Sequence, residues 1–258
     1  TAVPLAACRF DRTCLDVQVG DARLNESRLS GSAASTGHAI AWDLEYASDA
    51  PPLLLLPERM YEAGFPKAKA LVGSPLAVFR GTVTVDGEAH AIDGWVGSQN
   101  HNWGRRHTDR YAWGQVAGFA EAPDGFLECS TAQVKFGPLW SPRLTLVVLR
   151  IGGEEYAINT LARAARADGR WSYFEWTLRT GQGGVEIEAQ LSAPRAEFVG
   201  LTYANPPGGS KTCLNTKLAS ARVVLRRAGR PELRLHADRR AAFEILTDDA
   251  AHGVPVVA

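Results

Sequence analysis

The residues with the greatest chemical potential in this 258-residue chain gather in one stretch, residues 94–119. The stretch combines three of the seven tryptophans with two of the six histidines and several amide side chains. Buried amide and imidazole groups need hydrogen-bond partners, so an ordinary core strand would not carry them. The mixture is typical of the wall of a semi-polar pocket, in which apolar rings supply area and a few polar groups fix orientation.

Acid–base chemistry suits these residue types best. An imidazole gains and loses a proton near neutral pH, so His101 is a candidate proton donor or acceptor, with Tyr111 and Glu128 as its candidate catalytic partners. Indole ring faces are suited to stabilising a developing positive charge. The candidate substrate-binding residues share large or polar side chains at positions expected to face the pocket: Trp95, Asn100, Trp103, Arg105, Trp113, Gln115, Tyr203 and Asn215. The alternative is that Asn100 and His101 belong to a buried hydrogen-bond network that only holds strands together.

The sequence gives less support to a metal site or to a nucleophilic mechanism. His101 and His107 are six residues apart, which is about 20 Å on an extended strand and too far to share one ion. The chain has no H-E-x-x-H motif, no Cys/His cluster and no G-x-S-x-G elbow. We therefore expect neither a cofactor nor a metal.

Alternation in the same stretch predicts two β-strands. Large side chains fall on every second position of residues 99–107 and 111–119, and small residues separate those of the second set. A turn at Thr108 would join the strands as a hairpin and place Gln115 near His101. A shift of one residue in register would reverse which faces meet.

The rest of the chain is punctuated by glycine and proline into short strands, which predicts an all-β, antiparallel sandwich or barrel with one or two short helices. Residues 57–62 and 160–167 are the expected helices, and Asp86-Gly87 is the expected turn of a hairpin. Two β-rich halves are expected, residues 1–122 and 123–258, divided near an Ala-Pro-Asp-Gly turn.

The composition limits which binding partners and which cellular compartment we expect. Lys and Arg total 28 and Asp and Glu total 28, so the absence of net charge argues against nucleic acid or an anionic membrane surface as the main partner. No run of eighteen apolar residues exists to span a membrane, and no leader segment is visible, so a cytoplasmic location is expected. Cys8 and Cys14 could close a small loop, but free thiols are the favoured interpretation of the four cysteines.

The run Asn100-His101-Asn102-Trp103-Gly104, followed by Tyr111-x-Trp113 and the amide of Gln115, resembles a known signature. It is similar to that of the lipocalin-like superfamily that includes hydroxyneurosporene synthase (the carotenoid hydratase) and the AttH-like proteins, with tocopherol cyclase more distant. The chain looks like an uncharacterised bacterial branch of that superfamily. It differs from the carotenoid hydratases at Asn100, where they carry an acidic residue.

The resemblance implies a lipocalin-like antiparallel barrel or sandwich, with further strands ahead of Thr1. It implies a cofactor-independent lyase or isomerase, such as a hydratase or cyclase, that acts on a small lipophilic isoprenoid or polyene. Two rival functions remain open. One is a non-catalytic carrier of a hydrophobic ligand in the same cavity, and the other is a carbohydrate-binding β-sandwich that uses its tryptophans as stacking platforms.

Overall fold

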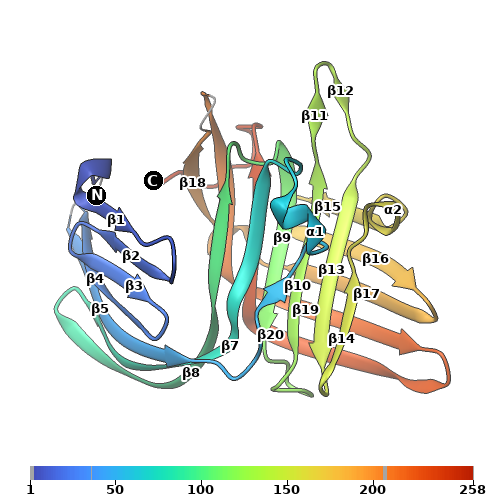
Figure 1. Cartoon of the computed structure of the whole chain (residues 1–258), viewed down its shortest axis with the longest axis horizontal. Helices are drawn as coiled ribbons and strands as arrows, with labels where there is room; N and C mark the ends of the chain where they lie inside the picture. Colours follow the sequence, from blue (N-terminus) through green and yellow to red (C-terminus); the bar gives the residue numbers. More distant parts are fainter. Residues whose placement is uncertain (1–2, 36, 206–207, 258) are drawn as a thin grey trace. The chain divides into compact units, whose positions relative to one another are not determined.

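A computed structural model describes residues 3–35, 37–205 and 208–257, and antiparallel β-sheet dominates it (Figure 1). The all-β prediction is confirmed. The chain divides into two compact units, of which the first comprises Thr1–Pro51 and Ser74–Gln99 and the second Pro52–Gly73 and Asn100–Ala258. Two long strands, β7 (Ala68–Val85) and β8 (Glu88–Gly104), contribute residues to both units.

The first unit is a sheet of strands that pair with their neighbours in chain order. Besides parts of β7 and β8 it contains η1 (Leu5–Ala7), β1 (Cys8–Phe10), β2 (Asp16–Val19), β3 (Ala22–Asn25), β4 (Arg28–Ser35) and β5 (His38–Ala47). The strand order is β1-β2-β3-β4-β5-β7, and β8 pairs with β7. Among the described residues of this unit, the buried apolar side chains are Tyr46, Ala77 and Ile92.

The second unit contains a ten-stranded sheet and most of the buried apolar side chains. Its elements are β6 (Leu53–Leu54), α1 (Arg59–Glu62), β9 (Arg110–Ala117), β10 (Phe126–Gln133), β11 (Lys135–Phe136), β12 (Leu139–Trp140), β13 (Leu144–Ile151), β14 (Glu154–Ile158), α2 (Leu161–Ala164), β15 (Asp168–Ser172), β16 (Glu175–Gln182), β17 (Val185–Ser192), η2 (Arg195–Glu197), β18 (Val199–Ala204), β19 (Ser210–Arg227) and β20 (Arg230–Thr247). The sheet order is β14-β13-β10-β9-β20-β19-β17-β16-β15, with β18 paired to β19.

Local sequence explains the hairpin between β7 and β8. Asp86 and Gly87 have φ angles of 51° and 87°, the left-handed conformation that a two-residue hairpin turn requires. The predicted hairpin is therefore confirmed. The two helices α1 and α2 lie within residues 57–62 and 160–167, where short helices were expected.

Small residues on one face of β9 let the sheet close over its core. Ala112 and Val116 are fully buried on that face. A Cβ added to Gly114, between them, would meet Leu191 Cδ2 at 2.5 Å and Trp176 Cζ3 at 3.1 Å. The small-residue face of β9 is thus its core face, and the large side chains of β9 lie on the other side of the sheet. Phe119, two residues beyond the strand, is also in the core.

The predicted hairpin between residues 99–107 and 111–119 is wrong. Strand β8 pairs with β7, whereas β9 lies between β10 and β20. The chain stays beside β7 past the end of β8, where the Arg105 amide donates to the Lys67 carbonyl at 3.0 Å. Alternation identifies a strand, but it does not identify the partner of that strand.

The division predicted between residues 122 and 123 falls inside the second unit. Residues 122–125 form the turn between β9 and β10, in which the Gly118 amide donates to the Gly125 carbonyl at 2.9 Å. These two strands then pair along their length. The turn therefore joins neighbouring strands of one sheet, and the compact units divide the chain elsewhere.

Candidate active site

The register of three strands gathers polar side chains on the face of β9 opposite the core. Gln115 lies opposite Glu128 of β10, and Trp113 lies opposite Glu244 of β20. Directly paired residues on antiparallel strands share a face, and so do residues two positions apart. One side of the sheet therefore carries both carboxyl groups, with Trp113 and Gln115 on the strand between them.

Glu128 is buried, with 3% of its surface exposed, and both of its oxygens accept a hydrogen bond. Trp113 Nε1 donates to Oε1 at 2.7 Å, and Gln115 Nε2 donates to Oε2 at 2.8 Å. The Gln115 amide also donates to Asn100 Oδ1 at 3.2 Å, which joins the end of β8 to this network. The carboxyl group is thus held in a fixed position by groups from two other strand positions.

Burial raises the pKa of Glu128 from its ordinary value of 4.5 to about 7. Removal of water disfavours the charged form, and the negative charge of Glu244 adds to the effect. The hydrogen bonds from Trp113 and Gln115 act in the opposite direction because they favour the carboxylate. The result is a carboxyl group that holds or releases a proton near neutral pH, as a general acid or base must.

Glu244 forms a second cluster on the same face. Its Oε1 accepts hydrogen bonds from the Asn215 amide and from Lys217 Nζ, the latter at 3.1 Å, and the Cys213 thiol donates to Oε2 at 3.7 Å. The Lys217 ammonium also lies 5.3 Å from the centre of the Trp113 ring. Trp113 therefore contacts Glu128 through its indole N–H and the Glu244 cluster through the lysine over its ring.

Glu244 was not predicted as a site residue from the sequence. A signal was present, because the residue interrupts an apolar run in Ala-Phe-Glu-Ile-Leu at residues 242–246. A charged side chain in a buried strand needs a partner, and Lys217 is that partner. The partners could not be found from the sequence, because β19 and β20 pair with a register that shifts at bulges between Thr216 and Ala221.

Tyr111, Tyr203 and Asn215 lie at this end of the face. Asn215 contacts Glu244 directly, and both tyrosine hydroxyls lie beside the Cys213 thiol. Burial, together with the nearby acidic groups, raises the pKa of Tyr111 and of Tyr203. Burial and Glu244 raise the pKa of Cys213 to about 12, so this thiol stays protonated. These groups can donate hydrogen bonds but are poor bases near neutral pH.

His101 takes part in a different set of contacts. Its ring stacks on Trp103 at 5.0 Å, and Trp103 contacts the ring of Tyr61 at 5.8 Å. Side chains alternate along β8, so His101 points away from the side on which Asn100 meets Gln115. The sequence did not single out Tyr61, whose pKa is raised by burial and by the charge of Glu128.

Two candidates lie apart from the Glu128 network. Trp95 belongs to the first unit and is 62% exposed there. The Arg105 side chain is exposed, and its described hydrogen bond is made by its backbone amide. Among the candidate residues, the structure thus joins Asn100, Trp113, Gln115 and Glu128 by hydrogen bonds, and it places Tyr111, Tyr203 and Asn215 around the neighbouring Glu244 cluster.

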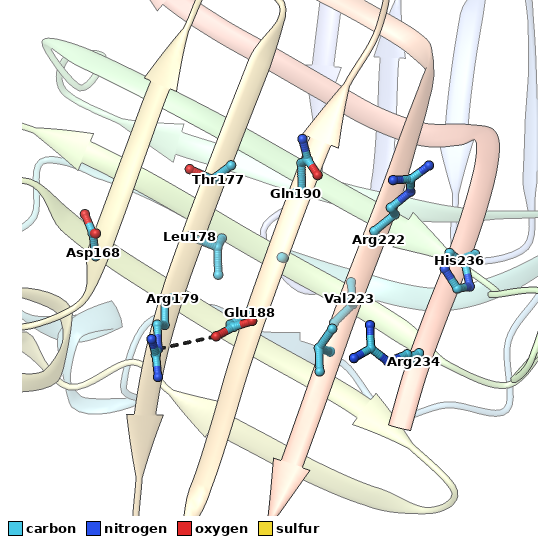
Figure 2. A pocket seen from close by; sticks show the side chains of 12 residues that line it. Asp168, Thr177, Leu178, Arg179, Glu188, Gln190, Arg222, Val223, Arg234 and His236 are labelled. Carbon is cyan, nitrogen blue, oxygen red and sulfur yellow. Dashed lines mark ion pairs between the residues drawn. The ribbon is translucent and has the colours of Figure 1, made fainter. Parts of the chain in front are cut away.

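A separate depression of about 370 Å³ lies over strands β15, β16, β17, β19 and β20 (Figure 2). Ion-pairing and polar side chains line much of it, and Figure 2 shows Arg179 paired with Glu188, at 3.4 Å. None of the candidate site residues lines it. We therefore do not assign the acid–base chemistry to this surface.

Three further observations concern the described part of the chain. No group of three or more His, Cys, Asp or Glu residues within it is arranged to hold a metal ion. Residues 3–35, 37–205 and 208–257 include no helix long and apolar enough to cross a membrane. All four cysteines are free.

Comparisons with known proteins identify solved structures that share this fold. No family model matches the chain. Two solved structures share its architecture: kievitone hydratase from Nectria haematococca (TM-score 0.56, 14% identity, 96% of this chain and 73% of that one) and a putative AttH protein from Nitrosomonas europaea (0.54, 14%, 94% and 72%). The chain has the fold of these two proteins. The predicted resemblance to lipocalin-like AttH and hydratase proteins is confirmed at the level of the fold.

Similarity in sequence leads to proteins without a described activity. The chain is 29% identical over 209 residues to an uncharacterised protein of Mycobacterium tuberculosis, found in two strains. The match covers 80% of this chain and 61% of the relative, so the chain spans about three fifths of the length of the curated proteins it matches.

Proposed function

We propose that the protein is a hydratase-like enzyme that adds water to, or removes it from, a small lipophilic alkene such as an isoprenoid, with Glu128 as the proton donor. The observation that supports this most strongly is the position of Glu128. It is buried, its pKa is raised to about 7, and it accepts hydrogen bonds on both oxygens. Such a group is protonated often enough near neutral pH to act as a general acid.

The two hydrogen-bond donors to Glu128 hold its carboxyl group in position and also favour the proposed reaction. When the carboxylic acid gives its proton to a double bond, it becomes a carboxylate in a dry environment. Trp113 Nε1 and Gln115 Nε2 already point at its oxygens at 2.7 and 2.8 Å and stabilise that new charge without rearranging. Aromatic rings on this face can stabilise the positive charge that forms on the substrate.

We assign the proton transfer to Glu128 in preference to His101. The imidazole stacks on Trp103 and projects from the side of β8 opposite Asn100, whereas the carboxyl group lies on the face shared with Trp113. Tyr111 lies on the same face and acts there as a hydrogen-bond donor, because its raised pKa keeps its hydroxyl protonated.

The likeness to kievitone hydratase supports the class of reaction by analogy. At 14% identity it shows a shared fold, and one fold can serve unrelated reactions. The substrate class therefore rests on the site, which combines indole and tyrosine rings with a few fixed polar groups. That combination suits a small lipophilic molecule.

The test is the change Glu128→Gln, which preserves the size of the side chain and removes its acid. We expect turnover to fall by about 10²–10⁴-fold, the usual contribution of a positioned general acid. Water addition would be followed by mass spectrometry with farnesol, geranylgeraniol, squalene and lycopene as probes. The matched control is Glu232→Gln, at a carboxylate of β20 that forms ion pairs with Arg226 and Arg234.

Loss of turnover in His101→Gln with full activity in Glu128→Gln would transfer the acid role to His101 and refute this assignment. Tight binding of a probe without any product, followed by tryptophan fluorescence, would instead indicate a carrier of hydrophobic ligands.

A further inference from the structure

The Glu244 cluster lies across Trp113 from the proposed acid. Glu128 and Glu244 stand on strands that flank β9, opposite positions two residues apart. Neighbouring strands are about 4.8 Å apart and residues rise about 3.3 Å along a strand, so the two backbones are roughly 12 Å apart. Both side chains rise from the same face, one on each side of Trp113.

We propose that Glu244 is a second catalytic residue, which accepts a proton from the water molecule that adds to the substrate. This inference rests on the function proposed above. Lys217 and Asn215 are its positioning residues, because both donate to the same carboxylate oxygen and fix its direction. Among the described residues, the donor to the other oxygen, Oε2, is the Cys213 thiol at 3.7 Å, a weak and long contact, so this oxygen is the better placed to accept from water.

The proton balance of hydration leaves one proton on the added water, which a base must remove. Glu128 gives its proton to one carbon of the double bond, and the electron pair of that bond forms the new C–H bond. The other carbon becomes positively charged, and a lone pair of water forms the C–O bond. The oxygen then carries one proton too many, which Glu244 takes. The cycle ends when Glu244 loses this proton to solvent and Glu128 regains one.

The surroundings of Glu244 suit both parts of this role. Its side chain is 15% exposed, so it faces a partly dry site, while its partner Lys217 is 60% exposed and reaches solvent. Tyr111 and Cys213, on the same face, are poor proton acceptors. Burial raises the pKa of Tyr111 and of Cys213, and both groups therefore hold their protons near neutral pH.

Hydrogen exchange in deuterium oxide distinguishes the proposed role of Glu128 from that of Glu244. In deuterium oxide, protonation and its reversal by Glu128 place deuterium in unreacted farnesol, and this step does not need Glu244. In Glu244→Gln we expect the hydration rate to fall by about 10²–10⁴-fold while deuterium incorporation stays within about threefold of wild type. In Glu128→Gln we expect both rates to fall together.

Two further variants make the result decisive. Lys217→Met removes one positioning donor, and we expect the hydration rate to fall by about tenfold with deuterium incorporation retained. Glu232→Gln on the same strand is the matched control and should keep both rates. Far-UV circular dichroism establishes that each variant is folded, and if Glu244→Gln does not fold, Lys217→Met carries the test by the same two rates.

Each outcome has a defined meaning. If wild type hydrates farnesol and Glu244→Gln does so at a comparable rate, the role of Glu244 is refuted while that of Glu128 stands. If deuterium incorporation and hydration fall equally in Glu244→Gln, the residue does not act selectively in water addition, and the inference is wrong. If wild type gives neither labelled substrate nor product with any of the four probes, the proposed function fails, and this inference fails with it.

Discussion

A carboxyl group inside a protein stays protonated for as long as desolvation outweighs the groups that favour its charge. At Glu128 the two effects are close enough to bring the pKa to about 7. The two donors, Trp113 and Gln115, are fixed in strand β9, so the balance does not depend on a mobile loop. A buried acid with this support is poised for proton transfer near neutral pH.

The same balance predicts how stability depends on pH. The folded protein binds the Glu128 proton more tightly than the unfolded chain, whose glutamates have a pKa near 4.5. The stabilisation is therefore complete below about pH 4.5 and is lost as the pH rises through about 7. A pKa change of this size corresponds to about 3 kcal/mol at most, at 1.36 kcal/mol per unit.

We expect urea unfolding of wild type and Glu128→Gln to show this difference directly. Between pH 5 and pH 8, wild type should lose up to about 3 kcal/mol more unfolding free energy than the variant. Subtracting the two proteins removes the contribution of the other carboxylates. Equal pH dependence in both proteins would contradict a raised pKa at Glu128.

At the residue scale, the sequence supplied some members of the site and missed others. Trp113 and Gln115 were selected because alternation in one strand placed them on one face, and that information is local. Glu244 contributes through pairing across β9 and β20, which is not local. A single charged residue in an apolar strand was the available signal, but the sequence could not show which strand would lie beside it.

Among the elements, β9 matters most, because it carries the core on one face and the candidate site on the other. The core face needs Gly114, since an added Cβ would lie 2.5 Å from Leu191 Cδ2. We expect Gly114→Ala to lower the unfolding free energy by about 1–3 kcal/mol through overpacking. Any shift of β9 would also move the two donors of Glu128, so turnover should fall with stability.

The matched control is Gly64→Ala, where an added Cβ would have no heavy atom within 4 Å. Its unfolding free energy should change by no more than about 0.5 kcal/mol. Thermal and urea unfolding of the two variants measure the contrast. A neutral Gly114→Ala would show that the core beneath β9 has room that the structure does not show.

In strand β19, alternation in the sequence predicts the buried face for part of the strand only. Cys213, Asn215 and Lys217 alternate with Leu214 and Leu218 in the sequence, which predicts one polar and one apolar face. Leu214 is fully buried, but Leu218 is 44% exposed. The register with β20 shifts between Thr216 and Ala219, and such an irregularity reverses the direction of the following side chains.

At the scale of the molecule, the two units differ in how many apolar side chains they bury. Tyr46, Ala77 and Ile92 are the buried apolar residues described in the first unit, whereas the second has a large continuous core that includes Trp176 and Phe243. Local stability follows the burial of apolar contacts. The units should therefore open with different free energies.

Amide hydrogen exchange followed by mass spectrometry tests this expectation. We expect peptides from β1, β2 and β3 to exchange at least about tenfold faster than peptides from β9, β10 and β17, because the short strands have no fully buried side chain. Uniform protection across both sets would mean that the chain unfolds as a single cooperative body.

The all-β class was predictable because turn residues and alternation recur along the whole sequence. The division into units was not, because it depends on contacts between segments far apart in the chain. Residues 52–73 join the second unit although residues on either side of them belong to the first. The Pro-Pro-Leu-Leu-Leu-Leu-Pro run of residues 51–57 begins at the first crossing, but no composition change marks the crossing at Gly73.

The interleaving of the two units along the chain has a consequence for how the protein evolves. Strands β7 and β8 each begin in one unit and end in the other, so no single cut in the gene separates the two bodies. Recombination that exchanged one of them for a foreign counterpart would have to replace several segments at once and preserve two continuous strands. The two units must therefore be inherited together, and changes in one are selected in the presence of the other.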